Sequence, residues 1–212
     1  MENRLHLPEP ALRRLPWYLS YAKLALEKGE TTISSTQIAF AIGVDSSVVA
    51  KDLSYIDVAG KTRVGYSTYT LIEVLESFLG FTQSHPAFLF GVGRLGGALL
   101  QDNGLRQFGL EIIAGFDVKY ELAGTNINHI PIHHFDKMCE LRRKTGVNIG
   151  VLTVPINQAQ EVADFLIQVH FKAIWNFTPI RIKVPDDIVV QNTSIYAHLA
   201  VMYNRLSQLK EE

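Results

Sequence analysis

Apolar positions in the first part of the chain recur at helical spacing. Pro16 lacks a backbone N–H group and fits poorly inside a helix, so the helix over residues 11 to 28 is expected to start or kink there. Gly29 follows its last turn, a common position for a helix-ending glycine. The apolar face of this predicted helix comprises Leu12, Leu15, Leu19, Ala22 and Leu26.

Two shorter helices are predicted next. Ser34 opens a capping box before the first of them, and Gly43 ends it after about two turns. The second is expected to begin near Asp45 or Ser46 and to continue to Tyr55. Two short helices joined by a tight turn that contains glycine are typical of a helix-turn-helix.

A ribbon and a fourth helix complete this unit. Residues 58–69 are punctuated by glycine and predict a β-ribbon, and a capped helix from Thr70 to Phe78 follows. Together these elements predict a winged helix-turn-helix domain over residues 1–80. Its third helix would enter a DNA groove, and the residues on or near the outer face of that helix are Ser47, Lys51, Ser54 and Tyr55.

Charge does not strengthen the prediction of DNA binding. Residues 1–66 contain eight Lys and Arg against seven Asp and Glu, which is short of a basic footprint. Short helical pairs also occur as plain packing units, so this alternative stays open.

From residue 81 to 190, apolar runs alternate with helical segments. Buried strands are predicted at residues 87–90, 110–117, 148–155 and 173–177, and helices around 135–144 and 158–169. This alternation predicts an α/β domain of the Rossmann type, with a parallel sheet whose ligand lies beyond the carboxyl ends of the strands.

A glycine turn follows the first of these strands. Gly91 lets the chain turn sharply, Gly93 lets the backbone approach a pyrophosphate, and Gly96 lets the next helix lie close to the strand. Asp117 ends the following strand, 21 residues after Gly96 (117 − 96), where a carboxylate accepts from both ribose hydroxyls and repels a 2′-phosphate. We therefore predict NAD(H) rather than NADP(H); a glycine turn that binds nothing is the alternative.

The ends of two later strands add candidate residues, which are expected to line the nicotinamide half of the coenzyme. The predicted cofactor-binding set is Gly91, Val92, Gly93, Arg94, Leu95, Gly96, Asp117, Thr153, Val154, Pro155, Asn176, Phe177, Thr178 and Pro179.

The last segment, residues 191–212, contains apolar positions at spacings of 4, 3, 4 and 3: Ile195, Leu199, Met202, Leu206 and Leu209. Such a seam is expected where one helix packs along another. We expect this helix to reach a partner subunit; alternatively, it covers its own domain.

Composition narrows the protein class. The chain has 212 residues, 47% of them hydrophobic, and a formal net charge of −1. No apolar run approaches the roughly 20 residues that span a bilayer, and the N-terminus lacks the apolar core of a secretion signal. Cys139 is the single cysteine, which excludes an internal disulfide; no metal-ligand spacing is present, and a reducing cytoplasm fits best.

Six segments in order resemble the Rex family of redox-sensing transcriptional repressors, and the likeness extends from about Leu12 to Leu206. The matching segments are residues 34–39, 51–55, 64–66, 91–96, 152–155 and 174–179. The resemblance implies a homodimer that senses the NADH/NAD⁺ ratio: an N-terminal winged helix binds operator DNA, NADH releases it, and the C-terminal helix is domain-swapped between subunits. It adds Ser34, Ser35, Lys61, Arg63 and Tyr66 to the predicted DNA contacts.

The sequence departs from the family pattern at several positions. Ala50 replaces an arginine before the Lys-Asp pair, and Thr62-Arg63 replaces the Lys/Arg-Gly of the wing; loss of a phosphate contact weakens binding and its salt dependence. Ser20, Ser194 and Asp102 stand where the family has an arginine, an aspartate and a tyrosine that relay the signal.

Two other functions compete with the repressor. An NAD-dependent oxidoreductase needs a proton donor or base near the nicotinamide, but the histidines after residue 128 have no paired acid at motif spacing, and no substrate domain is present. We therefore predict a protein that is not an enzyme. A nucleotide- or coenzyme A-binding assembly module, whose winged helix contacts protein, is the other alternative.

Overall fold

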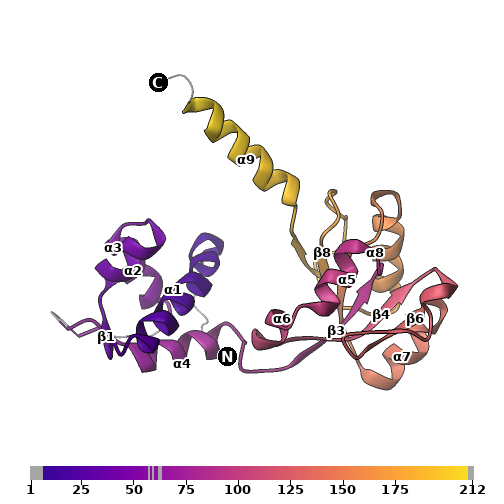
Figure 1. Ribbon diagram of the computed structural model, residues 1–212, viewed down its shortest axis with the longest axis horizontal. Coiled ribbons are helices and arrows are strands. Elements are labelled where there is room, and N and C mark those ends of the chain that lie inside the picture. Colours follow the sequence, from indigo (N-terminus) through magenta and orange to yellow (C-terminus); the bar gives the residue numbers. More distant parts are fainter. Residues whose placement is uncertain (1–6, 57, 59, 62–63, 210–212) are drawn as a thin grey trace. The chain divides into compact units, whose positions relative to one another are not determined.

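The computed structural model describes residues 7–56, 58, 60–61 and 64–209. The chain divides into two compact units, residues 1–83 and 84–212, shown in Figure 1. We describe each unit by itself.

The described residues of unit 1 form four helices and two short strands. They are α1 (Glu9–Glu27), β1 (Thr32–Ile33), α2 (Ser35–Ile42), α3 (Ser46–Ser54), β2 (Tyr66–Ser67) and α4 (Thr68–Phe78). The capping box predicted at Ser34 is present, with Gln37 N–H donating to its side chain, and Gly43 ends α2 in the left-handed conformation. The helix-turn-helix pair is thus formed by α2 and α3.

Helix α1 begins at Glu9, directly after Pro8, and continues through Pro16. Of the two expectations for Pro16, a helix start or a kink, the helix start is therefore wrong. An interior proline costs about 3 kcal/mol. Burying a large apolar side chain contributes about 1.5–3 kcal/mol, so a buried face outweighs this cost. The buried residues of α1 are Ala11, Leu15, Tyr18, Leu19, Ala22 and Ala25.

The predicted ribbon pairs differently from the expectation. β2 pairs antiparallel with β1, which precedes the helix-turn-helix, and within the described part of 58–69 only Lys61 and Gly65 form an isolated bridge. Gly65 has φ of 93°, and a Cβ there would collide with the Ile33 carbonyl, so glycine is required. Helix α4 begins at Thr68, and Ser67 caps it, not Thr70.

Unit 2 is built on a seven-stranded sheet with the order β5-β6-β4-β3-β7-β8-β9. All neighbouring pairs are parallel except β5 with β6. Without β5, an edge strand, this is the 3-2-1-4-5-6 order of the doubly wound dinucleotide-binding fold. The strands are β3 (His85–Phe90), β4 (Leu110–Asp117), β5 (Asn126–Ile127), β6 (Ile130–His134), β7 (Ile149–Leu152), β8 (Ala173–Asn176) and β9 (Val189–Asn192).

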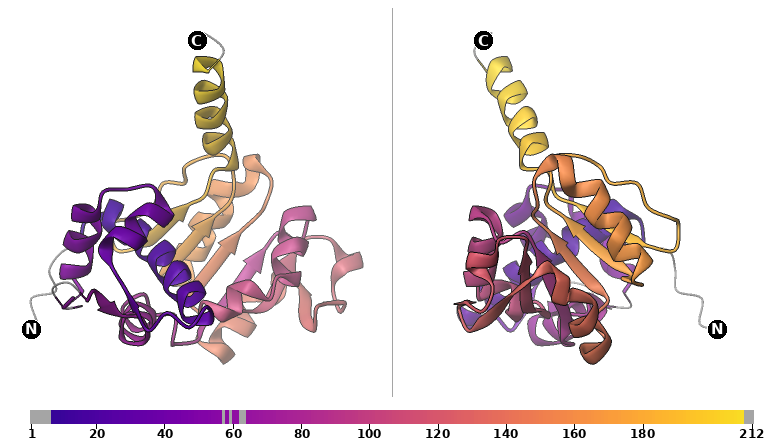
Figure 2. Two further views of the ribbon diagram at one scale, coloured as in Figure 1. Left: turned by 60° about the vertical axis from the view of Figure 1, so that its left-hand side comes forward. Right: turned by 90° about the vertical axis from the view of Figure 1, so that its right-hand side faces the viewer.

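Helices cover both faces of this sheet, as the two views of Figure 2 show. Alternate residues of β3 enter two separate cores, Phe88 and Phe90 on one face and Ala87 and Leu89 on the other. α7 and α8 contribute to the first core, and α5 and α6 to the second. Their bounds are α5 (Arg94–Gln101), α6 (Gly104–Gln107), α7 (Met138–Thr145) and α8 (Ala159–Gln168), with short 3₁₀ turns η1 (Tyr120–Leu122), η2 (Phe135–Lys137) and η3 (Ile156–Gln158).

The chain ends with α9 (Ile195–Gln208), which follows β9. None of its described residues is buried, and the seam residues Ile195, Met202, Leu206 and Leu209 are more than half exposed. The alternative that α9 covers its own domain is therefore not what the structure shows.

Candidate dinucleotide site and DNA-contacting surface

The glycine turn lies where the sheet order reverses. β3 and β7 are neighbours, and the chain leaves β3 toward α5 and β7 toward α8, on opposite faces. Ligands of open α/β sheets bind in the crevice beyond the carboxyl ends of the strands at this switch point.

The three glycines of the turn have different neighbours. Gly91 has φ of 93°, and a Cβ there would lie 2.8 Å from the Thr153 carbonyl oxygen. A Cβ on Gly96 would collide with the Gly91 carbonyl and lie 2.9 Å from Thr153 Oγ1. A Cβ on Gly93 would meet nothing within 4 Å. The fold itself requires Gly91 and Gly96, whereas Gly93 leaves open space where a pyrophosphate can approach the backbone.

Open space continues along the start of α5. A shallow depression of about 630 Å³ is lined by Gly93, Arg94, Gly97, Ala98, Gln101 and Asp102. The first N–H groups of a helix have no intrahelical partner and favour an anion. Arg94 and Leu95 are exposed at this helix start, and Val92 is buried beneath the turn.

Asp117 ends β4 beside the turn. Its Oδ2 accepts from the Val92 N–H at 2.7 Å, and its Oδ1 accepts from the Lys119 N–H at 3.0 Å. A carboxylate has about four lone-pair positions, so it can accept further hydrogen bonds, including those from ribose hydroxyls. The two backbone bonds fix the orientation of the carboxylate.

Thr153 ties the end of β7 to the turn. Its backbone N–H donates to the Phe90 carbonyl at 2.9 Å, and its hydroxyl lies 3.0 Å from that carbonyl and 2.7 Å from the Gly91 carbonyl. Val154 is half-buried and Pro155 is exposed at the same strand end.

Asn176, the last residue of β8, and Thr178, two residues later, are buried and hydrogen-bonded within the protein. Asn176 Oδ1 accepts from the Thr178 N–H and hydroxyl, and its Nδ2 donates to the Ile180 carbonyl and to Asn192. These two side chains therefore shape the loop, and the half-buried Phe177 and the exposed Pro179 are its more accessible members.

The predicted DNA contacts divide by exposure. On α3, Ser47, Lys51 and Ser54 are exposed, as a DNA-facing surface requires, and Tyr55, at the C-cap of this helix, is half-buried. Lys61 is also exposed, Ser34 caps α2, and Ser35 is half-buried. Two predicted contacts differ. Tyr66 is 8% exposed and packs in the core of unit 1, so it does not belong to this surface, and Arg63 lies outside the described residues.

An ion pair that the sequence did not predict connects α3 to α1. Asp52 accepts two hydrogen bonds from Arg14, at 2.7 and 2.9 Å, and one from the Tyr18 hydroxyl at 2.6 Å. Hydrogen bonding to Asp52 raises the pKa of the Arg14 guanidinium. The pKa of the Tyr18 hydroxyl is raised mainly by burial and secondly by its hydrogen bond to the Asp52 carboxylate. The available signal was helical spacing, since Asp52 shares a face with the buried Val49 and Leu53.

The three positions that depart from the family relay make local contacts. The Ser20 hydroxyl donates to the Pro16 carbonyl, Ser194 caps α9 by accepting from the Ala197 N–H, and Asp102 accepts from the N–H groups of Gly104 and Leu105.

The described ranges contain neither a membrane-spanning helix nor a metal-binding cluster. No helix there is long and apolar enough to cross a membrane. No group of three or more His, Cys, Asp and Glu side chains in that part of the chain is arranged to hold a metal ion.

Each of the two units contains a segment that matches a known family model. Residues 6–54 match the family model described as "Putative DNA-binding protein N-terminus", and residues 82–180 match the one described as "CoA binding domain". The chain is similar to crystal structures of RSP, a Rex-family repressor. The complex of RSP with β-NAD⁺ and operator DNA has a TM-score of 0.90 at 29% identity, covering 96% of this chain and 94% of that one. The complex with β-NADH has a TM-score of 0.87 at 28% identity, covering 97% and 96%.

Curated relatives extend the similarity over nearly the whole chain. The redox-sensing transcriptional repressor Rex of Bacteroides thetaiotaomicron is 62% identical over 201 residues, which cover 95% of this chain and 91% of that protein. Rex of Porphyromonas gingivalis is 61% identical over 203 residues, 96% of this chain and 93% of that protein. The chain belongs to the Rex family of redox-sensing transcriptional repressors.

Proposed function

We propose that this protein is a homodimeric repressor that binds operator DNA through α3 and the wing, the predicted ribbon over residues 58–69. NADH binding at the glycine turn then releases the protein from the DNA. The observation that carries the proposal is the hydrogen-bonded Asp117 carboxylate beside an open Gly93 in a chain whose other unit exposes Lys51 on a helix-turn-helix. The complexes of RSP with NAD⁺ and operator DNA, and with NADH, support the same pairing of ligands.

The residues of the site suit a dinucleotide. In the proposed complex, the N–H groups that begin α5 bind the pyrophosphate, Asp117 accepts from the adenosine ribose, and the loops after β7 and β8 line the nicotinamide. The coenzyme supplies the redox signal, and the protein distinguishes its two forms by binding them with different affinity.

Asp117 also separates NAD(H) from two related ligands. NADP(H) has a phosphate on the 2′-oxygen of this ribose and coenzyme A has one on the 3′-oxygen, so a carboxylate that accepts from both hydroxyls repels either phosphate. This argument favours NAD(H) over coenzyme A, although the family model that matches residues 82–180 is described by the latter.

Release from DNA follows from linkage. NADH shifts the equilibrium between DNA-competent and incompetent arrangements by its preference for one of them, about 1.4 kcal/mol for each tenfold. Recognition helices that must enter successive major grooves lose their fit after a modest rotation. Because Ser20, Asp102 and Ser194 replace the relay residues, this chain transmits the signal through other contacts. DNA and the coenzyme pool meet in the cytoplasm, where we place the protein.

Calorimetric titration with NADH and NAD⁺, followed by gel shifts on genomic fragments with and without NADH, tests the proposal. We expect tighter binding of NADH and a retardation that NADH reverses. Equal affinity for the two forms contradicts sensing. Turnover of a hydroxy substrate supports an oxidoreductase, and the absence of both retardation and turnover supports an assembly module.

A further inference from the structure

His134 contacts the segment that follows Asp117. The two residues are register partners at the ends of the parallel strands β6 and β4. Nε2 of His134 lies 3.1 Å from the Val118 carbonyl oxygen. The imidazole also stacks on the Tyr120 ring, with centroids 3.9 Å apart and planes 9° apart. A single side chain from β6 thus contacts both residues that flank Lys119.

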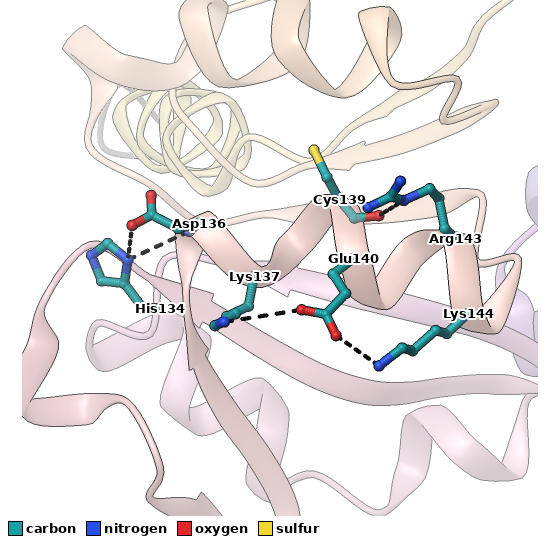
Figure 3. Close-up of polar contacts among 7 residues, drawn as sticks. All are labelled: His134, Asp136, Lys137, Cys139, Glu140, Arg143 and Lys144. Atoms are coloured by element: carbon teal, nitrogen blue, oxygen red, sulfur yellow. Dashed lines mark hydrogen bonds and ion pairs between the residues drawn. The ribbon is translucent and has the colours of Figure 1, made fainter.

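The other ring nitrogen faces Asp136, as Figure 3 shows. His134 Nδ1 lies 2.9 Å from Asp136 Oδ2 and 3.4 Å from the Asp136 backbone nitrogen. In the neutral ring with its proton on Nε2, Nδ1 accepts only the longer of these two contacts. The protonated ring donates to the Val118 carbonyl and to the Asp136 carboxylate at once, and the stacked Tyr120 ring attracts its charge.

The contacts of His134 bear on the coenzyme site through Lys119. The Lys119 N–H donates to Asp117 Oδ1, one of the two bonds that orient this carboxylate. Because His134 contacts Val118 and Tyr120, it restrains the backbone amide of Lys119, which lies between these two residues. A restrained segment pays less conformational entropy when a ligand binds the carboxylate.

We propose that His134 is a positioning residue for the coenzyme site, and that its protonation tightens NADH binding by holding residues 118–120 around the Asp117 contact. The inference deepens the proposed function and rests on it. Binding then favours the protonated ring, so its affinity is highest at low pH and falls as His134 loses its proton.

The pH dependence must be assigned among several groups. The titratable and charged residues on the segments that pack against or flank the imidazole are Asp117, Lys119, Tyr120, Glu121, His133, Asp136 and Lys137. Of these, His133 is the one other histidine, so the pH dependence must be compared between variants of the full-length protein.

NADH titrations at pH 6 and pH 8 test the proposal. For the unsubstituted protein, we expect binding about three- to tenfold tighter at pH 6 and proton uptake at pH 7, measured by calorimetry in two buffers of different ionisation enthalpy. His134→Gln can still donate to the Val118 carbonyl but does not titrate, so its affinity should vary little with pH and its proton uptake should vanish. Asp136→Asn should reduce the ratio between the two pH values.

His129→Asn is the matched control. His129 is exposed in the β5–β6 turn with φ of 64°, a conformation that asparagine tolerates, so this variant should keep the ratio of the unsubstituted protein. The inference is overturned if NADH binds equally at both pH values, or if His134→Gln keeps the same ratio and proton uptake. A protein that binds no NADH at either pH overturns the proposed function as well, which distinguishes the two failures.

Discussion

At the scale of a single residue, we propose that Asp117 sets the choice of coenzyme. Asp117→Asn keeps one acceptor oxygen but loses the charge that repels a phosphate and strengthens ribose hydrogen bonds. A hydrogen bond to a charged group is worth about 1.5–3 kcal/mol, so we expect NADH affinity to fall about tenfold and NADPH affinity to rise relative to it. Fluorescence titration with both coenzymes measures the ratio.

The control for this substitution is Glu121→Gln. Glu121 is an exposed acid in η1, four residues after Asp117. Its removal changes the net charge equally without touching the predicted contact. An NADPH/NADH preference that moves equally in both variants would assign the effect to overall charge and would contradict the role of Asp117.

Residues whose role follows from nearby positions in the chain could be predicted from the sequence. Gly91, Gly93 and Asp117 were found because their spacing alone identifies the turn and the strand end. Asp52 and His134 were missed because their partners are distant in sequence: Arg14 is 38 residues from Asp52, and Val118 is 16 residues from His134. Spacing rules say nothing about such pairs until the fold brings them together.

Two elements of the DNA-binding unit, α1 and α3, are joined by the Arg14–Asp52 ion pair. Asp52 is 3% exposed and Arg14 27% exposed at the side chain. Arg14→Ala leaves a buried carboxylate with the Tyr18 hydroxyl as its remaining side-chain partner, so we expect a loss of about 2–3 kcal/mol in the free energy of unfolding of unit 1. Weaker operator binding should accompany this loss, because α3 is less firmly placed.

The adjacent arginine supplies the control for Arg14→Ala. Arg13 pairs with Glu9 on the exposed side of α1, an ion pair of the kind worth at most about 1 kcal/mol. Denaturant unfolding followed by Trp17 fluorescence in a Trp175→Phe background reports on unit 1 alone. Equal losses for Arg13→Ala and Arg14→Ala would show that the buried pair has no special weight.

The buried Tyr18 hydroxyl, which also contacts Asp52, predicts that unit 1 loses stability at alkaline pH. Burial raises the pKa of Tyr18 above its unfolded value of 10. This group therefore adds stability that is complete below pH 10 and is lost as pH rises above it, by at most about 1.4 kcal/mol per pH unit. Tyr18→Phe should flatten the decline of unfolding free energy above pH 10, whereas Tyr203→Phe, at an exposed position of α9, should leave it unchanged.

Elements with long patterns were predicted better than short ones. The strands at 87–90 and 110–117 and the helix-turn-helix pair were identified, because several buried positions specify each. The ribbon expected over residues 58–69 was predicted in part: Lys61 and Gly65 form an antiparallel bridge, but the pairing of β2 with β1 was not expected, because these strands have two residues each, too few for a periodicity. Strand β9 was missed because it is an edge strand with no buried residue.

At the scale of the whole molecule, α9 determines the proposed assembly. Its apolar seam is exposed in the single chain, and a second copy of the chain is the proposed partner. A protein shortened to residues 1–193 should be monomeric by light scattering and should bind NADH within about threefold of the full chain. Operator affinity should fall by about 100-fold or more, because two linked recognition helices bind far more tightly than one.

Point substitutions test the apolar seam of α9 without removing the helix. Leu206→Asp places a charge on the seam and should weaken the dimer, whereas Asn204→Asp adds the same charge two residues away, off the seam, and should not. A shortened protein that remains dimeric would show that another surface holds the subunits together. If Leu206→Asp and Asn204→Asp dimerise equally well, the heptad seam is not the interface, because a buried charge on it would have to be desolvated without a partner.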